Sequence, residues 1–408
     1  MKSVDEHLEQ VLGTVRPLQP LPLTLGDAHG CVLAEDIAAG APMPPFDNSA
    51  MDGYAVRAED VAAAAPEAPV RLSVVGDVRS GSAPTYSVQP GYCLRIMTGA
   101  PAPAGAGGIV PVEHTDGAMG QVTIFQPVRP GQHIRWAGED QPAGAIVLSA
   151  GAFLGAAQLG LVAAAGRASV MCRPRPRVVV ISTGDELVEV GEPVPPGRVL
   201  DSNSHMLTAA AREAGAMPYR VGVIRDDPRL LIETLEDHLI RADVLVTSGG
   251  VSAGAYDVVK DVLSKLGTVR FDQVAMQPGM PQGFGVLGPD QTPIFTLPGN
   301  PVSALVSFEI FVRPALRKML GAEVLHRPSM SAIVTEPLRS PQGKRSYLRG
   351  VVERQPDGRV TARSAGGQGS HHLSPLAVAN ALLVVPEHVT EVPVGTVLAA
   401  LLLERRTR

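Results

Sequence analysis

The feature that most constrains the fold is segment 242–260, in which a short apolar run breaks into a loop of small residues and continues with a helical pattern. The run Val244–Thr247 predicts a buried strand. Asp257 and Lys260 lie one turn apart after the loop. This order lets backbone N–H groups and a helix N-terminus converge on an anion. We therefore predict phosphate binding by Lys260 and by the loop residues Ser248, Gly249, Gly250, Ser252 and Gly254.

Strand and helix patterns alternate around this segment. The predicted strands are 178–182, 219–223, 244–247 and 294–297, and the predicted helices are 201–215, 229–240 and 301–320. Such alternation implies a parallel, doubly wound α/β sheet, whose ligands bind at the carboxyl ends of the strands. Three loops, 182–186, 247–254 and 298–301, follow strand ends, so we expect them to meet at one edge of the sheet.

The last of these loops also contains a helix start signal. Asn300 is placed to be the N-cap and Pro301 the first helical residue. The predicted substrate-binding residues of this loop are Pro298, Gly299, Asn300 and Pro301.

The rest of the chain has a different sequence pattern. A capping box, Ser3 to Glu6, begins an N-terminal helix, and the Ala- and Gly-rich run 151–166 suggests a closely packed internal helix. Short β-prone runs fill two further regions, 46–137 and the segment after about 325. In the first region they are 54–56, 70–75, 91–97, 108–112 and 122–125. We predict an N-terminal helical and linker domain, a mostly β motif domain, the α/β domain and a small C-terminal β-barrel. Their bounds are 1–45 with 138–172, 46–137, 173–325 and 326–408.

Acidic residues follow several of the predicted strands. Asp185 and Glu186 are adjacent after one strand, and Asp226 follows another. Carboxylates at such positions can bind Mg²⁺ beside substrate phosphates. Each also has a structural alternative. Asp185 and Glu186 would be solvated turn residues, segment 225–227 a helix-capping turn before Pro228, and Asp257 a helix cap. Together with the Gly-rich loop they indicate metal-assisted chemistry on a phosphate or pyrophosphate.

Composition excludes several classes of protein. The net charge of −5 argues against a general nucleic-acid binder. The three cysteines form neither a disulfide framework nor a zinc pattern. No signal peptide is evident, and the most apolar run, 151–166, is too short to span a bilayer. We expect a cytoplasmic protein without a membrane partner. Walker A, Gly-x-Gly-x-x-Gly and His-Glu-x-x-His motifs are absent from the sequence.

Six ordered motifs closely resemble the molybdopterin molybdenumtransferase family, the bacterial molybdenum insertases related to the gephyrin E domain. They are Phe46–Val56 (FDNSAMDGYAV), Arg95–Pro101 (RIMTGAP), Gly138–Asp140 (GED), Ser182–Glu186 (STGDE), Ser248–Gly254 (SGGVSAG) and Leu297–Ser303 (LPGNPVS). The resemblance extends from about Ser3 to about Leu403.

The resemblance implies a homodimer that acts on adenylylated molybdopterin and molybdate. Mg²⁺-assisted cleavage of the pyrophosphate link would release AMP, and molybdenum would enter the dithiolene. The site would lie between the pterin-binding α/β domain of one subunit and the motif domain of the other. A molybdopterin adenylyltransferase and molybdoenzymes are possible partners.

The resemblance also assigns residues by position. The catalytic set is Asp52, Glu186, Asp226 and Asp257, of which Asp52, Glu186 and Asp257 would hold the metal. Thr98 and Asp140 would join Asp52 from one subunit, and Pro298 and Pro301 would belong to the pterin domain. Arg349 and Ser370 match positions in the C-terminal domain, where Arg349 would hold an oxyanion with two N–H groups.

One segment departs from the family pattern. In Phe271–Pro281, positions that lysines can occupy in the family hold Gln273, Gln277 and Met280. A neutral side chain cannot supply the charge attraction that molybdate or pyrophosphate gains from lysine. The candidates to replace this charge are Arg270, Lys260, Lys344 and His371.

Two alternatives to an insertase follow from these observations. The first is an adenylyltransferase acting one step earlier, because that activity resides on a similar α/β domain. The large N-terminal half and the C-terminal domain argue against it. The second is a non-catalytic molybdopterin-binding scaffold or a specialised paralogue. The missing lysines favour it, and the retained acidic residues argue against it.

Overall fold

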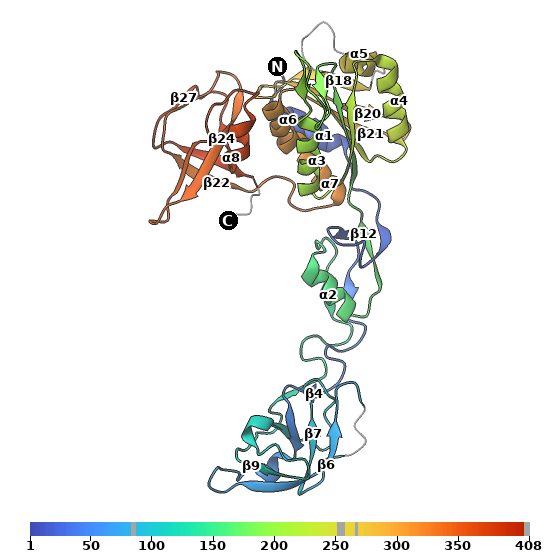
Figure 1. The fold of residues 1–408 in the computed structure, drawn as a ribbon, viewed down its shortest axis with the longest axis vertical. Coiled ribbons are helices and arrows are strands. Elements are labelled where there is room, and N and C mark those ends of the chain that lie inside the picture. Colours follow the sequence, from blue (N-terminus) through green and yellow to red (C-terminus); the bar gives the residue numbers. More distant parts are fainter. Residues whose placement is uncertain (83–86, 251–257, 266–267, 404–408) are drawn as a thin grey trace. The chain divides into compact units, whose positions relative to one another are not determined.

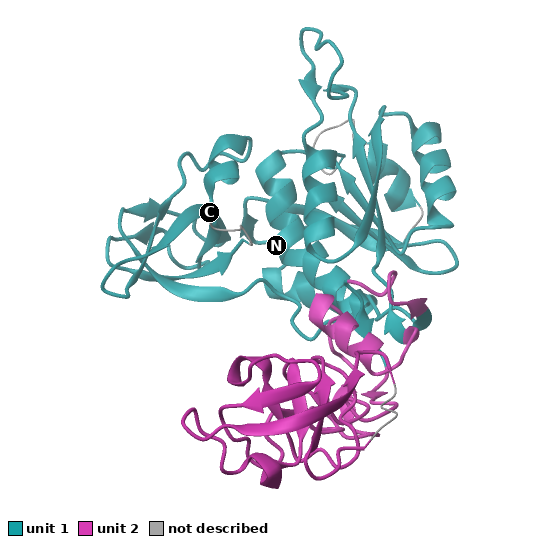
Figure 2. Cartoon of the chain, turned by 60° about the horizontal axis from the view of Figure 1, so that its bottom comes forward, with its two compact units in different colours: residues 1–22, 30–34, 171–408 teal, residues 23–29, 35–170 magenta. Residues whose placement is uncertain are grey.

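The computed structural model describes residues 1–82, 87–250, 258–265 and 268–403. The chain divides into two compact units (Figure 2). The first contains 1–22, 30–34 and 171–408, and the second contains 23–29 and 35–170. None of the described helices is long and apolar enough to span a membrane.

A six-stranded sheet forms the centre of the first unit, in the order β16-β13-β17-β21-β20-β18. Its strands are β13 (Arg177–Thr183), β16 (Met217–Ile224), β17 (Val244–Ser248), β18 (Val269–Gln273), β20 (Pro281–Leu287) and β21 (Thr292–Leu297). The first four in spatial order run parallel, as predicted. β20 is antiparallel to β21 and to β18, so β18 has the same direction as the first four. The direction changes because a short turn containing Gln291 (φ +55°), and no helix, joins β20 to β21.

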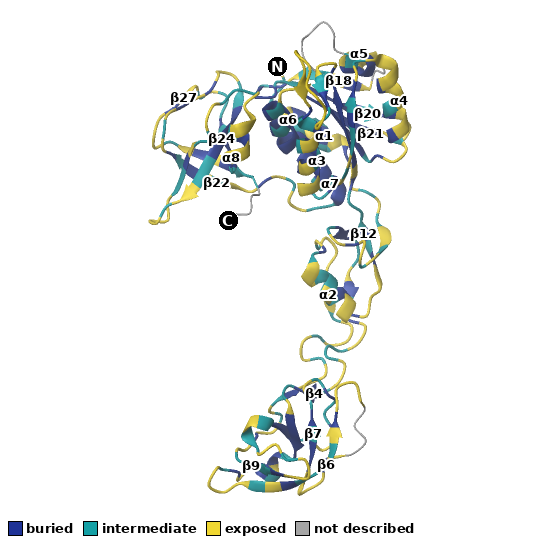
Figure 3. Cartoon of the chain, in the orientation of Figure 1, coloured by how far each residue is buried: buried dark blue, intermediate teal, exposed yellow. Residues whose placement is uncertain are grey.

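Helices cover both faces of this sheet (Figure 1). One layer contains α1 (Val4–Thr14), α3 (Asn203–Glu213), α6 (Pro301–Ser307) and α7 (Arg313–Leu320), and the other contains α4 (Pro228–Leu239) and α5 (Val258–Lys265). Val178 and Val180 of β13 pack into the first layer, and Val179 and Ile181 into the second. This alternation of one strand between two apolar layers is the doubly wound fold. The sheet is accordingly buried on both sides (Figure 3).

The long helix predicted over 301–320 is continuous but not uniform. Its middle part, Phe308–Val312, is a π-helix between α6 and α7. Asn300 is the N-cap residue and Pro301 begins the helix, as predicted, although the Asn300 side chain makes no capping hydrogen bond. The capping box at Ser3 and Glu6 is present at the start of α1.

The C-terminal part of the first unit is a closed barrel. Its strands are β22 (Ser329–Val334), β24 (Arg345–Arg354), β25 (Val360–Ser364), β26 (Ala381–Val385) and β28 (Val397–Leu402), and β24 closes the ring with β26. A short strand from the α/β region, β19 (Met276–Gln277), pairs with β24 as an additional strand of this sheet. A short helix, α8 (Leu373–Val378), follows β25.

The second unit contains the predicted β domain. Its five-stranded sheet has the order β8-β5-β7-β6-β9. The strands are β5 (Gly53–Val56), β6 (Val70–Val78), β7 (Tyr92–Ile96), β8 (Gly108–Pro111) and β9 (Gln121–Ile124). All five β-prone runs of this region are therefore strands.

The prediction of a closely packed internal helix in 151–166 is wrong for the single chain. The helix, α2 (Ala156–Ala164), exists, but Val162 is its one buried residue. Its other faces carry small apolar side chains that no described element covers, among them Ala156, Ala157, Ala163 and Ala164.

Candidate functional site

The loops that follow β13, β17 and β21 meet at the carboxyl edge of the sheet. Gly249 donates its N–H to Leu297 O (3.1 Å). A Cβ at Gly249 would lie 2.4 Å from Thr183 O, and the backbone φ of Gly249 is +101°. Only glycine therefore allows the β17 loop to pass so close to the β13 end. Ser248 and Pro298 are buried, whereas Gly299 and Asn300 are exposed.

Asn203, in the first turn of α3, connects two of these loops. Its Nδ2 donates to Ser248 Oγ (2.8 Å) and to Gly299 O (2.6 Å). Its Oδ1 is buried and has no partner among the described residues. The sequence indicated only a helix start here, because the contact depends on chain segments 45 and 96 residues away. Asn203 is a site residue that the sequence analysis missed.

Three carboxylates gather beside these loops. Asp185 N donates to Asp226 Oδ2 (3.3 Å), and Asp226 N donates to Asp185 Oδ1 (3.4 Å). Burial, together with the charges of Asp185 and Glu186, raises the pKa of Asp226. A nearby cation would reverse this effect, because it would stabilise the charged form of the carboxylate. The helix-cap role belongs instead to Asp227, which accepts from Arg229 N (2.8 Å) and Leu230 N (3.3 Å).

Part of the predicted site lies outside the described residues. Asp257, Ser252 and Gly254 belong to this part, whereas Gly250 is described with φ +71° and Lys260 lies exposed on α5. Within the described ranges, no three His, Cys, Asp or Glu side chains are grouped to hold a metal.

Asp52 and Thr98 are brought together in the second unit. Asp52 Oδ1 accepts from the Thr98 backbone N–H (2.6 Å) and from Thr98 Oγ1 (2.7 Å). These bonds, with a smaller contribution from Arg95, lower the pKa of Asp52. Asp140 is exposed, and its backbone N–H donates to Met43 O (3.0 Å).

Arg349 is a buried cation with free donors. Its side chain is fully buried on β24, and burial lowers its pKa. Nη2 donates to Gly367 O (2.6 Å) and Gly369 O (3.1 Å), but Nε and Nη1 have no partner in the described part of the chain. A buried guanidinium without a carboxylate favours an anion.

A hydrogen bond to Ser370 connects the Arg349 region to the edge of the sheet. The Ser370 carbonyl accepts from Val302 N (3.1 Å) in the first turn of α6, directly after the 298–301 loop. The predicted residues Pro298, Pro301, Ser370 and Arg349 therefore lie in one neighbourhood.

The segment with the missing lysines borders the same neighbourhood. Gln277 pairs with Ser346 of β24. Gln282, a buried residue, donates from Nε2 to Gly279 O and to Ser307 Oγ of α6, both at 2.6 Å. The turn 277–280 is thus fixed against the helix that Ser370 contacts. Gln273 is exposed, and Gln277 and Met280 are half-buried.

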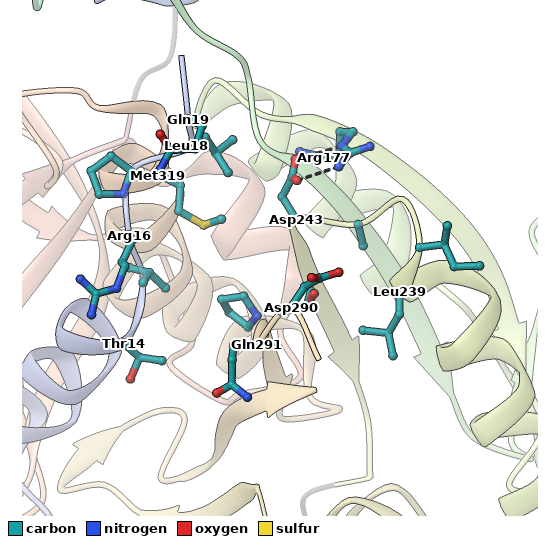
Figure 4. A pocket seen from close by; sticks show the side chains of 16 residues that line it. Thr14, Arg16, Leu18, Gln19, Arg177, Leu239, Asp243, Asp290, Gln291 and Met319 are labelled. Atoms are coloured by element: carbon teal, nitrogen blue, oxygen red, sulfur yellow. Dashed lines mark hydrogen bonds and ion pairs between the residues drawn. The ribbon is translucent and has the colours of Figure 1, made fainter. Parts of the chain in front are cut away.

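A cavity of about 410 Å³ lies at the other end of the strands (Figure 4). Arg177 and Asp243, which mark the beginnings of β13 and β17, form an ion pair in its wall (2.8 Å). It contains none of the predicted site residues.

Three family descriptions match the chain. Residues 2–166 match the MoeA N-terminal region (domain I and II), 179–318 a probable molybdopterin binding domain, and 331–403 the MoeA C-terminal region (domain IV). Two Mycobacterium tuberculosis proteins named molybdopterin molybdenumtransferase 2 and 1 are 49% and 39% identical, and each comparison covers 97% of this chain and 98% of the relative. A crystal structure of the molybdopterin biosynthesis moeA protein from Pyrococcus horikoshii OT3 is 30% identical, with a TM-score of 0.76 over 98% of this chain and 100% of that one.

Proposed function

This chain belongs to the MoeA family of molybdopterin molybdenumtransferases, and on that premise we propose how its residues divide the insertion of molybdenum. It is an enzyme of molybdenum cofactor biosynthesis. Its substrates in this proposal are adenylylated molybdopterin and molybdate. Water cleaves the pyrophosphate link, which leaves one phosphate on the pterin and the other on AMP.

The observation that carries the proposal is the meeting of three loops and three carboxylates at one sheet edge. The backbone N–H of Gly250 would hold a phosphate, because that of Gly249 is already bonded to Leu297 O. Glu186 and Asp226, with Asp257 and with Asp52 of the partner subunit, would hold Mg²⁺ and orient the attacking water. The ion would neutralise part of the negative charge of the pyrophosphate.

Molybdate would bind next to the pterin half, at Arg349 and Ser370. Support comes from the two unpaired N–H groups of the buried Arg349. With neutral residues at Gln277 and Met280, this arginine would supply positive charge for the oxyanion.

A homodimer is part of the proposal. The small apolar residues that α2 leaves uncovered suit close packing against a second copy of the chain. Thr98 and Asp140 would then join Asp52 in completing the site of the partner subunit.

A defined assay tests this function. Purified protein, adenylyl-molybdopterin and Mg²⁺ are mixed, and AMP release is followed while molybdate is titrated. We expect AMP release that saturates with molybdate. Pterin binding without molybdate-dependent AMP release would reject the proposal in favour of a scaffold.

A further inference from the structure

The barrel strand that carries Arg349 has two different strand partners along one of its edges. β26 pairs with β24 from Ser346 to Gly350. On the opposite edge, β25 pairs with β24 from Gly350 to Arg354, and β19 pairs with it at Arg345 and Ser346. Arg349 lies between these two pairings, so no described strand pairs with its backbone on this edge.

The side chain of Gln368 occupies this gap between β25 and β19. Its Oε1 accepts from Arg349 N (3.0 Å), and its Nε2 donates to Arg349 O (3.1 Å). Nε2 also donates to Ser364 Oγ (2.8 Å) and Gly366 O (3.1 Å), so the amide is fixed by its own segment as well. One side-chain amide therefore pairs with both backbone groups of Arg349, as a residue of a neighbouring strand would.

The guanidinium group of Arg349 binds the same segment in return. Nη2 donates to Gly367 O (2.6 Å) and Gly369 O (3.1 Å), which lie on either side of Gln368. Because Nη2 has two hydrogens, the two carbonyls use both. The orientation of the guanidinium is thus fixed by this segment. Nε and Nη1, which have no partner among the described residues, are the nitrogens left for a ligand.

Ser370 belongs to the same short segment, 366–370. Its carbonyl accepts from Val302 N (3.1 Å) in the first turn of α6. A displacement of this segment at Gln368 would therefore move Ser370 together with the two carbonyls that hold Arg349. The two residues at which we place the oxyanion both depend on the contacts of one neutral side chain.

We infer that Gln368 is a positioning residue for the oxyanion, because it fixes Arg349 and Ser370 relative to each other and leaves Nε and Nη1 of the arginine for the ligand. This inference rests on the proposed function, which places molybdate at these two residues. Gln368 acts through Arg349 and has no part in the cleavage of the pyrophosphate. Its loss should therefore affect molybdate and not the adenylylated pterin.

The test combines a calorimetric titration of the intact protein with molybdate and the AMP-release assay. Gln368→Met keeps the length of the side chain but removes its hydrogen-bonding groups. We expect it to weaken molybdate binding about tenfold, comparable to the loss of one charge-assisted hydrogen bond. The KM for molybdate should rise similarly, and the KM for adenylyl-molybdopterin should not change.

Two further variants make this test specific. Gln355→Met is the matched control, because Gln355 lies in the turn between β24 and β25 and donates to Thr361 Oγ1 (2.8 Å), away from Arg349. It should leave both KM values near those of the wild type. Gln368→Glu keeps the acceptor for Arg349 N but cannot donate to Arg349 O. It should also raise the KM for molybdate alone, and it decides the question if Gln368→Met does not fold.

Two results would overturn the inference. One is a KM for molybdate within about twofold of the wild type in a Gln368 variant that thermal unfolding shows to be folded. The other is an equal rise in Gln355→Met, which would mean that any weakening of the barrel has this effect. If the wild type releases AMP in response to molybdate in either case, the proposed function stands and only the role of Gln368 is wrong. A wild type that binds molybdate without releasing AMP would instead reject the proposed function, and the titration alone would then decide the role of Gln368.

Discussion

His7 is a buried base within the apolar layer under the sheet. Its ring packs edge-on against Phe311 (4.7 Å between centroids), and Asp272 is 3.8 Å from Nδ1. Burial, helped by Lys2 and opposed by Asp272, lowers the pKa of His7 to about 4. The unfolded chain takes up a proton near pH 6.5, so stability is complete above that pH and falls as the pH drops toward 4.

We predict that protonation of His7 in the unfolded chain lowers the free energy of unfolding by about 2 kcal/mol as the pH falls from 7 to 5. Urea unfolding of His7→Phe should lack that part of the pH dependence. His326→Phe, which changes an exposed histidine of the same unit, should keep it. An unchanged pH dependence in His7→Phe would show that other groups cause the acid sensitivity.

Gln277 is the residue at which this chain departs most directly from the family pattern near Arg349. Because Arg349 would act there without a lysine, we expect Gln277→Lys to lower the KM for molybdate about tenfold, the effect of one charge-assisted hydrogen bond. Gln277→Met keeps the position neutral and should leave this KM near the wild-type value. Equal KM values for all three proteins would mean that another cation already supplies the charge.

Asp226 and Asp227, which lie next to each other before helix α4, have different roles. Asp227 caps the helix, so Asp227→Ala should cost about 1 kcal/mol in unfolding free energy and leave turnover largely intact. Asp226 makes no cap, and its raised pKa means that its charge is unfavourable in the fold. Asp226→Asn should therefore abolish AMP release without loss of stability. Reversed effects on stability and turnover would contradict this division.

Elements with local signals could be predicted from the sequence. The capping box of α1, the Asn-Pro start of α6 and the five strands of the motif domain all have such signals. The meeting of three loops followed from parallel topology alone. The role of Asn203, the pairing of β19 with the barrel and the exposure of α2 depend on tertiary contacts, so no pattern of neighbouring residues could indicate them.

At the scale of the whole molecule, the proposed site needs two subunits. Asp52→Asn and Glu186→Gln should each inactivate the enzyme. Unfolding and refolding the two variants together should restore about a quarter of wild-type activity, because half of the dimers are mixed and each mixed dimer has one intact site. No recovery in mixed dimers would mean that each subunit builds its site from its own chain.

The pairing of β19 with β24 has a consequence for how this enzyme can vary. The turn 277–280 belongs by sequence to the α/β region, yet its backbone is hydrogen-bonded to the strand that carries Arg349. Any small displacement of the barrel therefore moves this turn and the buried arginine as one body. At the oxyanion site proposed above, substitutions on the outside of the barrel would then change which oxyanion binds, without a change in any residue of the site.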